Sequence, residues 1–529
     1  MSAIGEVRQL AVRGAGATVF SAGVTLAVQI LATVVLARLL TPKDFGLVAM
    51  VTTFSLLLTN FGLNGFTEAV LQREKIDHAL ASNLFWINLA TGALLSIGFA
   101  AAGSLLARFY REPAVAHVAV GVSFSIFITS TSVFHLALLK RAMRFGAVSV
   151  NDIIARFVSV AVSIILGLTG WGYWALVAGA IALPLSQSLG AWYLCRWVPG
   201  VPRRAAGTGS MLRFALNVYS RFGVNYFARN TDNLLIGWRF GSYSLGFYKR
   251  AYDLFAMPAS QIAAPLANVA VSALSRFKGD AIQYRRHLLG AIALMAFVAM
   301  GLGADLTLTG KDVIRLVLGA KWGEAGRIFT FFGPGIGIML VYYTQSWIHL
   351  SAGRADRWLR WSIMESVFTG LLFVIALPWG PAGIAFAWTA AFWIFLIPGF
   401  WYAGKPVGIG IAPFVAAIWR YVVASLLAGG VSAVITRGRA GFIAMAGASG
   451  ALTRIVIVSA LFWALYLIAV VLLYRGYSSL LHLAGLLKEM LPQSLLSRLY
   501  PADAVNQNQD LTSRDCAEEA CGNSVGTPT

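Results

Sequence analysis

The sequence predicts an all-α polytopic membrane protein with about fourteen transmembrane helices, and three observations support this fold class. First, 58% of the 529 residues are hydrophobic, only 12% are charged, and the mean hydropathy is +0.74. A soluble chain carries about 25% charged residues. Second, apolar stretches of the roughly 20 residues that a helix needs to cross a bilayer recur almost to residue 474. Third, the loops between these stretches are short, which leaves almost no soluble mass.

The spans are predicted from these apolar runs in chain order. The first run, 15–39, is too long for the core of a signal peptide and lacks a small-residue cleavage site, so we expect it to remain as a span. The seventh run, 212–238, carries polar residues. We still expect it to cross, because otherwise every later loop would change sides and the basic loops 276–286 and 354–360 would face outward. The predicted spans are 15–39, 45–63, 81–106, 115–139, 147–168, 172–195, 212–238, 245–273, 287–309, 325–350, 359–378, 382–403, 413–435 and 453–474.

The formal net charge of +20 comes from 41 Lys and Arg against 21 Asp and Glu. These cations gather in alternate loops, which is the bias of cytoplasmic loops in inner-membrane proteins. We therefore expect a multi-pass protein of the bacterial inner membrane with both termini in the cytoplasm, and no binding to nucleic acid. The three cysteines, Cys195, Cys516 and Cys521, form neither a metal-binding nor a disulfide pattern.

An internal repeat is visible once the spans are placed. A shift of 200 residues lays Leu40–Gly46 over Phe240–Gly246, and a shift of 208 lays Trp171–Gly172 over Trp379–Gly380. This spacing predicts two six-helix bundles related by an internal repeat, with a site between them, and two further C-terminal helices. The predicted organisation is a cytoplasmic N-terminus at 1–14, bundles at 15–200 and 201–404, helices thirteen and fourteen at 405–475, an amphipathic surface helix at 476–500 and a disordered cytoplasmic tail at 501–529.

The span 212–238 carries a charged face at membrane depth. Arg221, Asn225 and Arg229 are four residues apart and Asp232 follows three later, so all four share one side of a helix. Charged groups inside a membrane are costly unless they face a wet cavity or each other. The fixed fork of arginine donors suits phosphate oxygens. Under the 200-residue shift the first three positions meet the neutral Ser21, Thr25 and Gln29.

We therefore predict a cationic cavity that attracts an anionic, diphosphate-like head group. Ordinary helix packing explains Tyr226 at least as well as a binding role does. Lys249 and Asp253, four residues apart, could equally form a neutralised structural pair. The predicted substrate-binding set is Arg221, Asn225, Tyr226, Arg229, Lys249 and Arg250.

Three carboxylates are candidates for ion coupling, because an acid at membrane depth can bind a cation or a proton. They are Asp232, Asp253 and Glu365, and Asp232 could instead only neutralise Arg229. The sequence has no G-x-x-x-x-G-K-[ST] loop, no clustered set of metal ligands and no large extracytoplasmic loop for a glycosyltransferase or polymerase. We expect a secondary transporter driven by an H⁺ or Na⁺ gradient, with no catalytic residues, metal or cofactor.

Several short motifs resemble those of one transporter family. Leu39–Gly46, which reads LLTPKDFG, resembles the LL-x-P-x-x-[FY]-G hairpin of polysaccharide flippases in the multidrug/oligosaccharidyl-lipid/polysaccharide superfamily. Leu139–Phe145 and Gly170–Val177 also resemble family motifs, as do Asp232–Gly237 and Leu318–Trp322 (LGAKW) in the second half. The resemblance covers about residues 15–475 and is greatest to the Wzx-like exporters of polysaccharide repeat units.

This resemblance implies two six-helix bundles around a central cavity. It also implies alternating access, which would move an oligosaccharide on undecaprenyl diphosphate between the leaflets for exopolysaccharide, capsule or O-antigen biosynthesis. The family's cationic lining would fall on Arg221 and Arg229, and its Asp on Asp232. Ala320 replaces an acid often seen in the LGAKW motif, a departure to which we attach no functional consequence. The implied partners are the lipid-linked oligosaccharide, membrane lipids, a polysaccharide polymerase and a chain-length regulator.

Two other activities in the same superfamily remain open. A multidrug/cation antiporter would need an acidic cavity and usually has twelve spans, so the basic face and the predicted count argue against it. A peptidoglycan-precursor flippase also has fourteen spans and a cationic cavity, and only the motifs favour polysaccharide export over it.

Overall fold

The computed structural model describes residues 3–72, 77–202, 208–437 and 447–476. Within these helices it leaves out the side chains of 3–19, 61–72, 208–225, 227–229, 255–258, 260–265, 268 and 437. The described residues form helices joined by short turns and contain no strand. The predicted surface helix, 476–500, and tail, 501–529, lie outside the described residues, except for Gly476.

The first half of the protein, which we define as α1 to α6, packs around α4. α3 lies along α4, α5 lies along both α6 and α1, and α2 and α6 also lie against α4. α4 is accordingly the most enclosed of the candidate spans in this half. The bounds are α1 (Ala3–Leu39), α2 (Pro42–Gln72), α3 (His78–Tyr110), α4 (Ala114–Arg141), α5 (Phe145–Leu168) and α6 (Tyr173–Cys195).

The turn between α1 and α2 shows why its sequence ends one helix and starts the next. Asp44 Oδ2 accepts hydrogen bonds from the Thr41 backbone N–H (2.8 Å) and from Thr41 Oγ1 (2.6 Å). Thr41 Oγ1 in turn accepts from the Asp44 N–H (3.3 Å), which completes a reciprocal capping box. Pro42 stands at the first helical position, where its missing N–H costs nothing.

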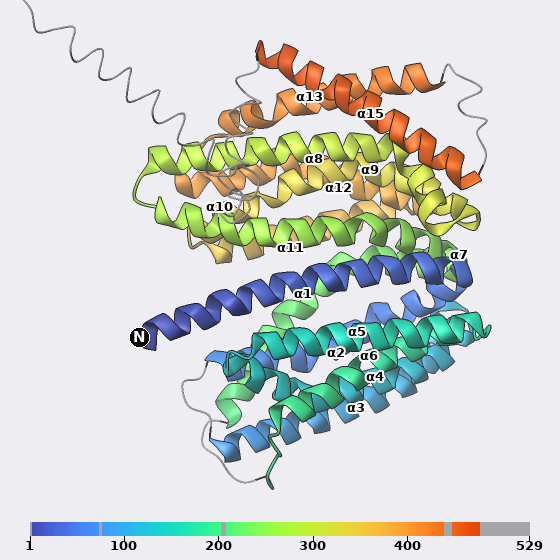
Figure 1. The fold of residues 1–529 in the computed structure, drawn as a ribbon, viewed down its shortest axis with the longest axis vertical. Coiled ribbons are helices and arrows are strands. Elements are labelled where there is room, and N and C mark those ends of the chain that lie inside the picture. The colour runs from blue at the N-terminus through green and yellow to red at the C-terminus, as the bar shows by residue number, and fades with distance from the viewer. Residues whose placement is uncertain (1–2, 73–76, 203–207, 438–446, 477–529) are drawn as a thin grey trace, which may run out of the picture. The chain divides into compact units, whose positions relative to one another are not determined.

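The second half, which we define as α7 to α12, packs around α9. α9 lies against α7, α8 and α12, and α11 lies against α12 and α7. Figure 1 shows α2 to α6 gathered on one side of the ribbon and α8, α9, α11 and α12 on the other. The bounds are α7 (Thr208–Arg276), α8 (Ala281–Leu318), η1 (Ala320–Trp322), α9 (Gly323–Tyr343), α10 (Gln345–Ser351), α11 (Ala355–Ala376), η2 (Leu377–Trp379) and α12 (Gly380–Gly404). After this half come η3 (Lys405–Val407), α13 (Ile411–Arg437) and α15 (Gly447–Tyr474).

α7 is two helices joined at a sharp break. Gly241 has φ 79° and ψ −178°, a conformation outside the helical region that glycine adopts at little cost. The break falls between the predicted spans 212–238 and 245–273. The sequence therefore predicts the position of this break correctly. The two helical stretches of α7 extend up to Gly241, beyond the ends of the predicted spans.

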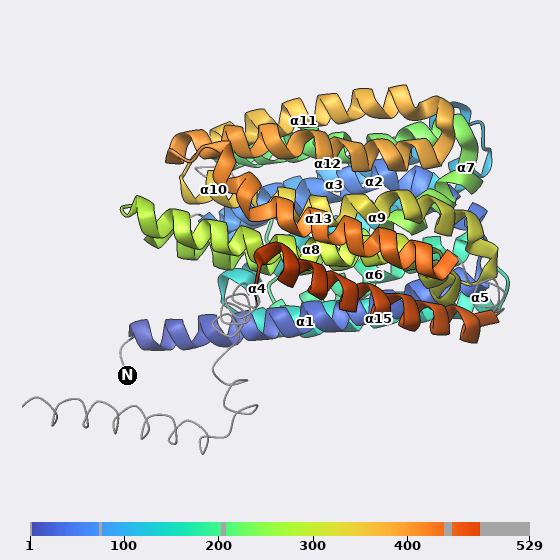
Figure 2. The same ribbon diagram turned by 90° about the horizontal axis from the view of Figure 1, so that it is seen from above.

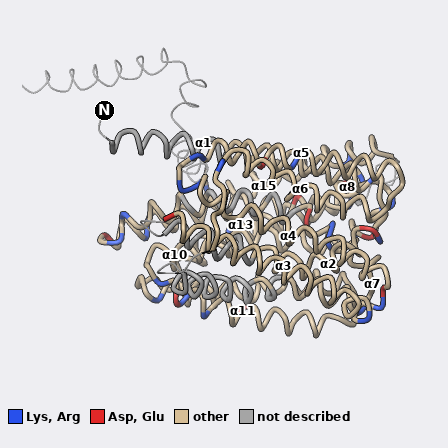
Figure 3. The backbone as a smooth tube through the Cα atoms, turned by 90° about the horizontal axis from the view of Figure 1, so that it is seen from below, with Lys and Arg blue, Asp and Glu red and all other residues tan. Residues whose placement is uncertain are grey.

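The predicted class, an all-α polytopic membrane protein, is confirmed. Among the described residues, ten helical segments are long and apolar enough to cross a membrane. Every predicted span except 45–63, 212–238 and 245–273 overlaps one of them, and the segment Ala355–Val407 holds two. Figures 1 and 2 show helices running side by side, and Figure 3 shows Lys and Arg mainly near helix ends. The count of fourteen stays a prediction.

The chain divides into a compact unit from Met1 to Tyr466 and a second unit, Leu467–Thr529, of which the structure describes only the end of α15. Within the first unit, α15 is attached to α8 by polar contacts. The Arg454 guanidinium donates from Nε to both carboxylate oxygens of Asp312 (3.1 Å each). Ser459 Oγ (2.8 Å) and Trp463 Nε1 (3.3 Å) donate to Asp305. These contacts pair two acids of α8 with donors on α15.

Candidate functional site

The two halves meet most extensively where α2 packs against α7. A Cβ added at Gly46 would overlap the backbone carbonyl of Ser242, and one added at Gly246 would overlap the carbonyl of Pro42. Positions 42 and 46 correspond to 242 and 246 under the 200-residue shift. The contact is therefore reciprocal, and each glycine allows the backbone of the other half to approach closely.

The predicted cationic face lies on α7 before the break at Gly241. The side chains of Arg221, Asn225 and Arg229 lie outside the described residues, so their role stays a prediction. Tyr226 is half-buried, and its hydroxyl donates to the Thr52 carbonyl of α2 at 3.4 Å. This stretch of α7 thus lies against the first half.

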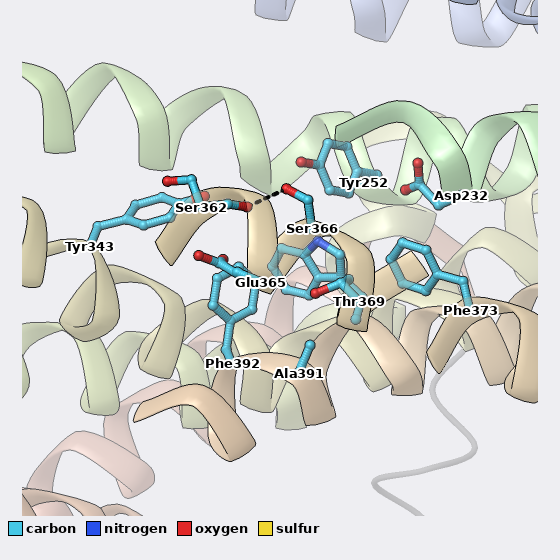
Figure 4. Close-up of a pocket in the computed structure, with 11 residues that line it drawn as sticks. Asp232, Tyr252, Tyr343, Ser362, Glu365, Ser366, Thr369, Phe373, Ala391 and Phe392 are labelled. Carbon is cyan, nitrogen blue, oxygen red and sulfur yellow. Dashed lines mark hydrogen bonds between the residues drawn. The ribbon is translucent and has the colours of Figure 1, made fainter. Parts of the chain in front are cut away.

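Two of the predicted coupling acids line one cavity in the second half. Asp232 comes from α7 and Glu365 from α11, and the cavity between them measures about 100 Å³. Ser362, Ser366 and Thr369 add hydroxyl groups from α11, as Figure 4 shows, and aromatic rings of α7, α9 and α12 complete the walls. The structure therefore brings together carboxylates that are far apart in the sequence.

A tyrosine hydroxyl holds each of these carboxylates. The Tyr248 hydroxyl donates to Asp232 Oδ2 at 2.8 Å, and Asp232 is only 3% exposed. The Tyr342 hydroxyl donates to Glu365 Oε2 at 2.9 Å and accepts from Trp361 Nε1 at 2.6 Å. Both acids are therefore oriented by the surrounding helices.

This arrangement can hold a small cation or ordered water. Carboxylate and hydroxyl oxygens are the ligands that hard cations prefer. One water needs about 10–15 Å³, so the cavity has room for several waters. In the part of the chain that the structure describes, no group of three or more His, Cys, Asp or Glu side chains could hold a metal.

The remaining predicted residues lie elsewhere. Lys249 forms an ion pair with Asp253 one turn along α7, and its ammonium lies 5.5 Å from the centre of the Tyr252 ring. The Arg250 guanidinium lies 4.0 Å above the ring of Phe45 on α2. Asp253 and Lys249 thus form the neutralised pair that the sequence left open, and Arg250 lies at the contact between the halves.

Sequence reasoning missed the groups that surround the acid pair. Ser362, Ser366 and Thr369 recur with Glu365 at helical spacing in an otherwise apolar span, a signal that could have been read from the sequence. The tyrosines Tyr248 and Tyr342 carry no such signal, because aromatic residues are common throughout these helices.

A family model matches more than half of the chain. Residues 35–327 match the model whose description reads "Polysaccharide biosynthesis protein". The matched region runs from the end of α1 into α9, so it includes the contact between α2 and α7 and the side of the cavity that carries Asp232.

The proteins similar to the chain include two curated proteins and one solved structure. The teichuronic acid biosynthesis protein TuaB of Bacillus subtilis (strain 168) is 25% identical over 325 residues, which cover 59% of this chain and 67% of that protein. The succinoglycan biosynthesis transport protein ExoT of Rhizobium meliloti (strain 1021) is 20% identical over 357 residues, covering 68% and 72% respectively. A structure described as "Lipid II flippase MurJ, inward closed conformation" has the same fold. Its TM-score is 0.68 at 17% identity, over 88% of this chain and 99% of that one.

Proposed function

Because the chain belongs to the polysaccharide biosynthesis protein family, we propose that it is a flippase for lipid-linked oligosaccharide repeat units. It would move an oligosaccharide on undecaprenyl diphosphate from the cytoplasmic to the periplasmic leaflet of the bacterial inner membrane. The product would enter exopolysaccharide, capsule or O-antigen biosynthesis. The observation that carries this proposal is the family match over residues 35–327, and the transport function named for the succinoglycan protein supports it.

Alternating access between two bundles is the proposed mechanism. The reciprocal glycine contacts at Gly46 and Gly246 support a repeat of two six-helix bundles, because two related copies that meet face to face make each contact twice. A substrate path would run between α2 and α7, where the halves touch. Both termini would lie in the cytoplasm, which places the turn between α1 and α2 on the periplasmic side.

The diphosphate would bind the cationic face of α7. Arg221 and Arg229 would donate to phosphate oxygens and Asn225 would add an amide. The hydrogen bond from Tyr226 to α2 supports this placement, since it sets the same stretch of α7 beside the path between the halves.

Ion coupling would act at the cavity of Asp232 and Glu365. Its size suits a cation or a proton carried on water, and it lies inside the second half, so its occupancy can change how these helices pack. Asp253 is a weaker candidate because Lys249 neutralises it. The protein would act as a secondary transporter beside a polysaccharide polymerase and a chain-length regulator.

Reconstituted vesicles provide the test. Undecaprenyl-diphosphate-linked oligosaccharide carries a fluorescent tag on its sugar, and dithionite, which does not cross the membrane, destroys only the tag in the outer leaflet. We expect the protein to expose the inner-leaflet tag to dithionite. A tagged peptidoglycan precursor and a cationic dye, run in parallel, represent the two other activities of the superfamily. Exposure of either of these, with none of the oligosaccharide, would refute the proposed substrate.

A further inference from the structure

The carbonyl end of α1 is capped by the second half of the protein. The last carbonyls of a helix have no partner within it. Lys321 Nζ donates to the carbonyls of Arg38 (2.9 Å) and Leu40 (2.5 Å), and Trp322 Nε1 donates to the carbonyl of Ala37 (2.9 Å). The lysine charge also lies at the negative end of the helix dipole. One short turn, η1, therefore supplies three donors to the end of a helix more than 280 residues away in sequence.

The first half returns a similar contact. Arg38, in the last turn of α1, donates from a guanidinium nitrogen to the carbonyl of Leu316 at 2.9 Å. Leu316 lies in the last turn of α8, which ends at Leu318. Each half thus extends a cation to the carbonyl end of a helix in the other half.

The indole of Trp322 fixes the position of this turn. Trp322 is fully buried between two phenyl rings, Phe45 of the first half at 5.5 Å and Phe247 of the second half at 5.8 Å between ring centres. Lys321, its neighbour, is exposed. Water can therefore replace the ammonium at the α1 carbonyls when the halves separate, whereas the indole must leave an apolar socket.

We propose that Lys321 and Trp322 form a latch that holds the two halves together at the end of the path where α1 terminates, and that this latch opens in every transport cycle. The inference rests on the proposed alternating access, in which the halves part first at one end and then at the other. Contacts that cross between the halves at one end can exist in only one of the two states. In the proposed orientation, this is the periplasmic end.

The geometry also explains why a lysine serves here. Its flexible stem lets one compact charge reach two carbonyls at once. When the halves separate, water can bind the ammonium and both carbonyls, so no buried polar group is left without a partner. Lys321 and Trp322 are positioning residues in this account, since neither has to touch the substrate.

A removable cross-link tests the need for opening. In a background with the native cysteines replaced by serine (Cys195, Cys516 and Cys521), Leu40→Cys and Lys321→Cys are joined by a bifunctional methanethiosulfonate. Its spacer should match the lysine stem. We expect oligosaccharide movement to stop on cross-linking and to return when a reductant cleaves the bridge.

The matched control is Asp312→Cys with Arg454→Cys, treated identically. These positions join α15 to α8 and do not cross between the two halves. We expect movement to continue in the bridged control. Normal movement with the Leu40→Cys and Lys321→Cys pair fully bridged would overturn the latch.

A labelling experiment needs no substrate and separates the latch from the proposed function. Met50 is fully buried on α2 beside Gly237 of α7. In Met50→Cys protein, Lys321→Met should raise labelling by a membrane-impermeant maleimide from the outer side about tenfold, the size expected for losing charge-assisted hydrogen bonds. Lys321→Arg, which can still donate, should label like the parent protein.

An error in the proposed substrate and an error in the proposed latch give different results. If the parent protein moves no oligosaccharide but Lys321→Met still exposes the Met50→Cys thiol, the proposed substrate is wrong and the latch stands. If labelling is the same with Lys, Arg and Met at position 321, the latch is wrong even when transport is normal.

Discussion

The close approach of the two halves makes a direct prediction about Gly46 and Gly246. Gly46→Ala places a methyl group on the carbonyl of Ser242, and Gly246→Ala places one on the carbonyl of Pro42, in each case in the opposite half. Backbone atoms cannot rotate aside as a flexible side chain can, so α2 and α7 must move apart. We therefore expect Gly46→Ala and Gly246→Ala to weaken the contact between the halves by similar amounts.

The magnitude follows from two opposing terms. Overpacking in a well-packed interior costs about 1–3 kcal/mol, and alanine recovers up to about 1 kcal/mol over glycine in a helix. Gly98 on α3 supplies the matched control, because a Cβ there meets nothing within 4 Å. Gly98→Ala should then be neutral or more stable than the parent. The helix gain is common to all three variants, so either contact variant should lie about 1–3 kcal/mol below this control.

Thermal unfolding in detergent, followed at one scan rate, measures the effect as an apparent melting temperature. A fixed rate is needed because such unfolding is often irreversible. Transport in vesicles is measured on the same samples. If Gly46→Ala has the same apparent melting temperature as Gly98→Ala, the backbones of the two halves do not approach as closely as the structure shows. The reciprocal contact is then refuted.

The remaining predictions concern the acids and the arginines. Asp232→Asn and Glu365→Gln should each remove the stimulation of transport by an imposed proton or sodium gradient. Asp253→Asn should keep this stimulation, because the Asp253 carboxylate is paired with a lysine. Equal gradient dependence in all three variants would exclude the cavity as the coupling site. Arg221→Ala and Arg229→Ala should each lower surface polysaccharide in a flippase-null cell by at least about tenfold at normal protein level, since each loses charge-assisted hydrogen bonds. Full output from the double variant would contradict the cationic path.

The positions of the helices follow from the sequence because a bilayer demands long apolar runs whose backbone bonds are satisfied internally. The ends of the helices are less predictable, because hydropathy detects only the part of a helix that lies within the hydrocarbon core of the bilayer. The predicted span 287–309 is the centre of α8, which starts at Ala281 after the N-cap Asp280. That cap accepts hydrogen bonds from the N–H groups of Ile282 and Gln283, so local polar chemistry sets the boundary.

Which acids share a site depends on how the helices are rotated, and hydropathy does not report rotation. Asp232, Asp253 and Glu365 are equivalent candidates in the sequence. A four-residue spacing predicts the pairing of Asp253 with Lys249, and the structure confirms it, because partners on one helix need no tertiary information. The meeting of Asp232 and Glu365 requires α7 and α11 to face each other. The contact of Lys321 with α1 likewise depends on how two distant parts of the chain are placed.

The repeat is readable at the hairpins and faint within the spans for a physical reason. A glycine at a backbone crossing cannot change without a clash, whereas a polar residue within a span can change its partner. Ser21, which corresponds to Arg221, donates its hydroxyl to the Ser149 carbonyl of α5 at 3.3 Å and so packs inside the first half. If Arg221 packed inside the second half in the same way, Arg221→Ala would lower the amount of folded protein. Loss of transport at an unchanged protein level would show that the repeat has assigned the same helical position to packing in one half and to the substrate path in the other.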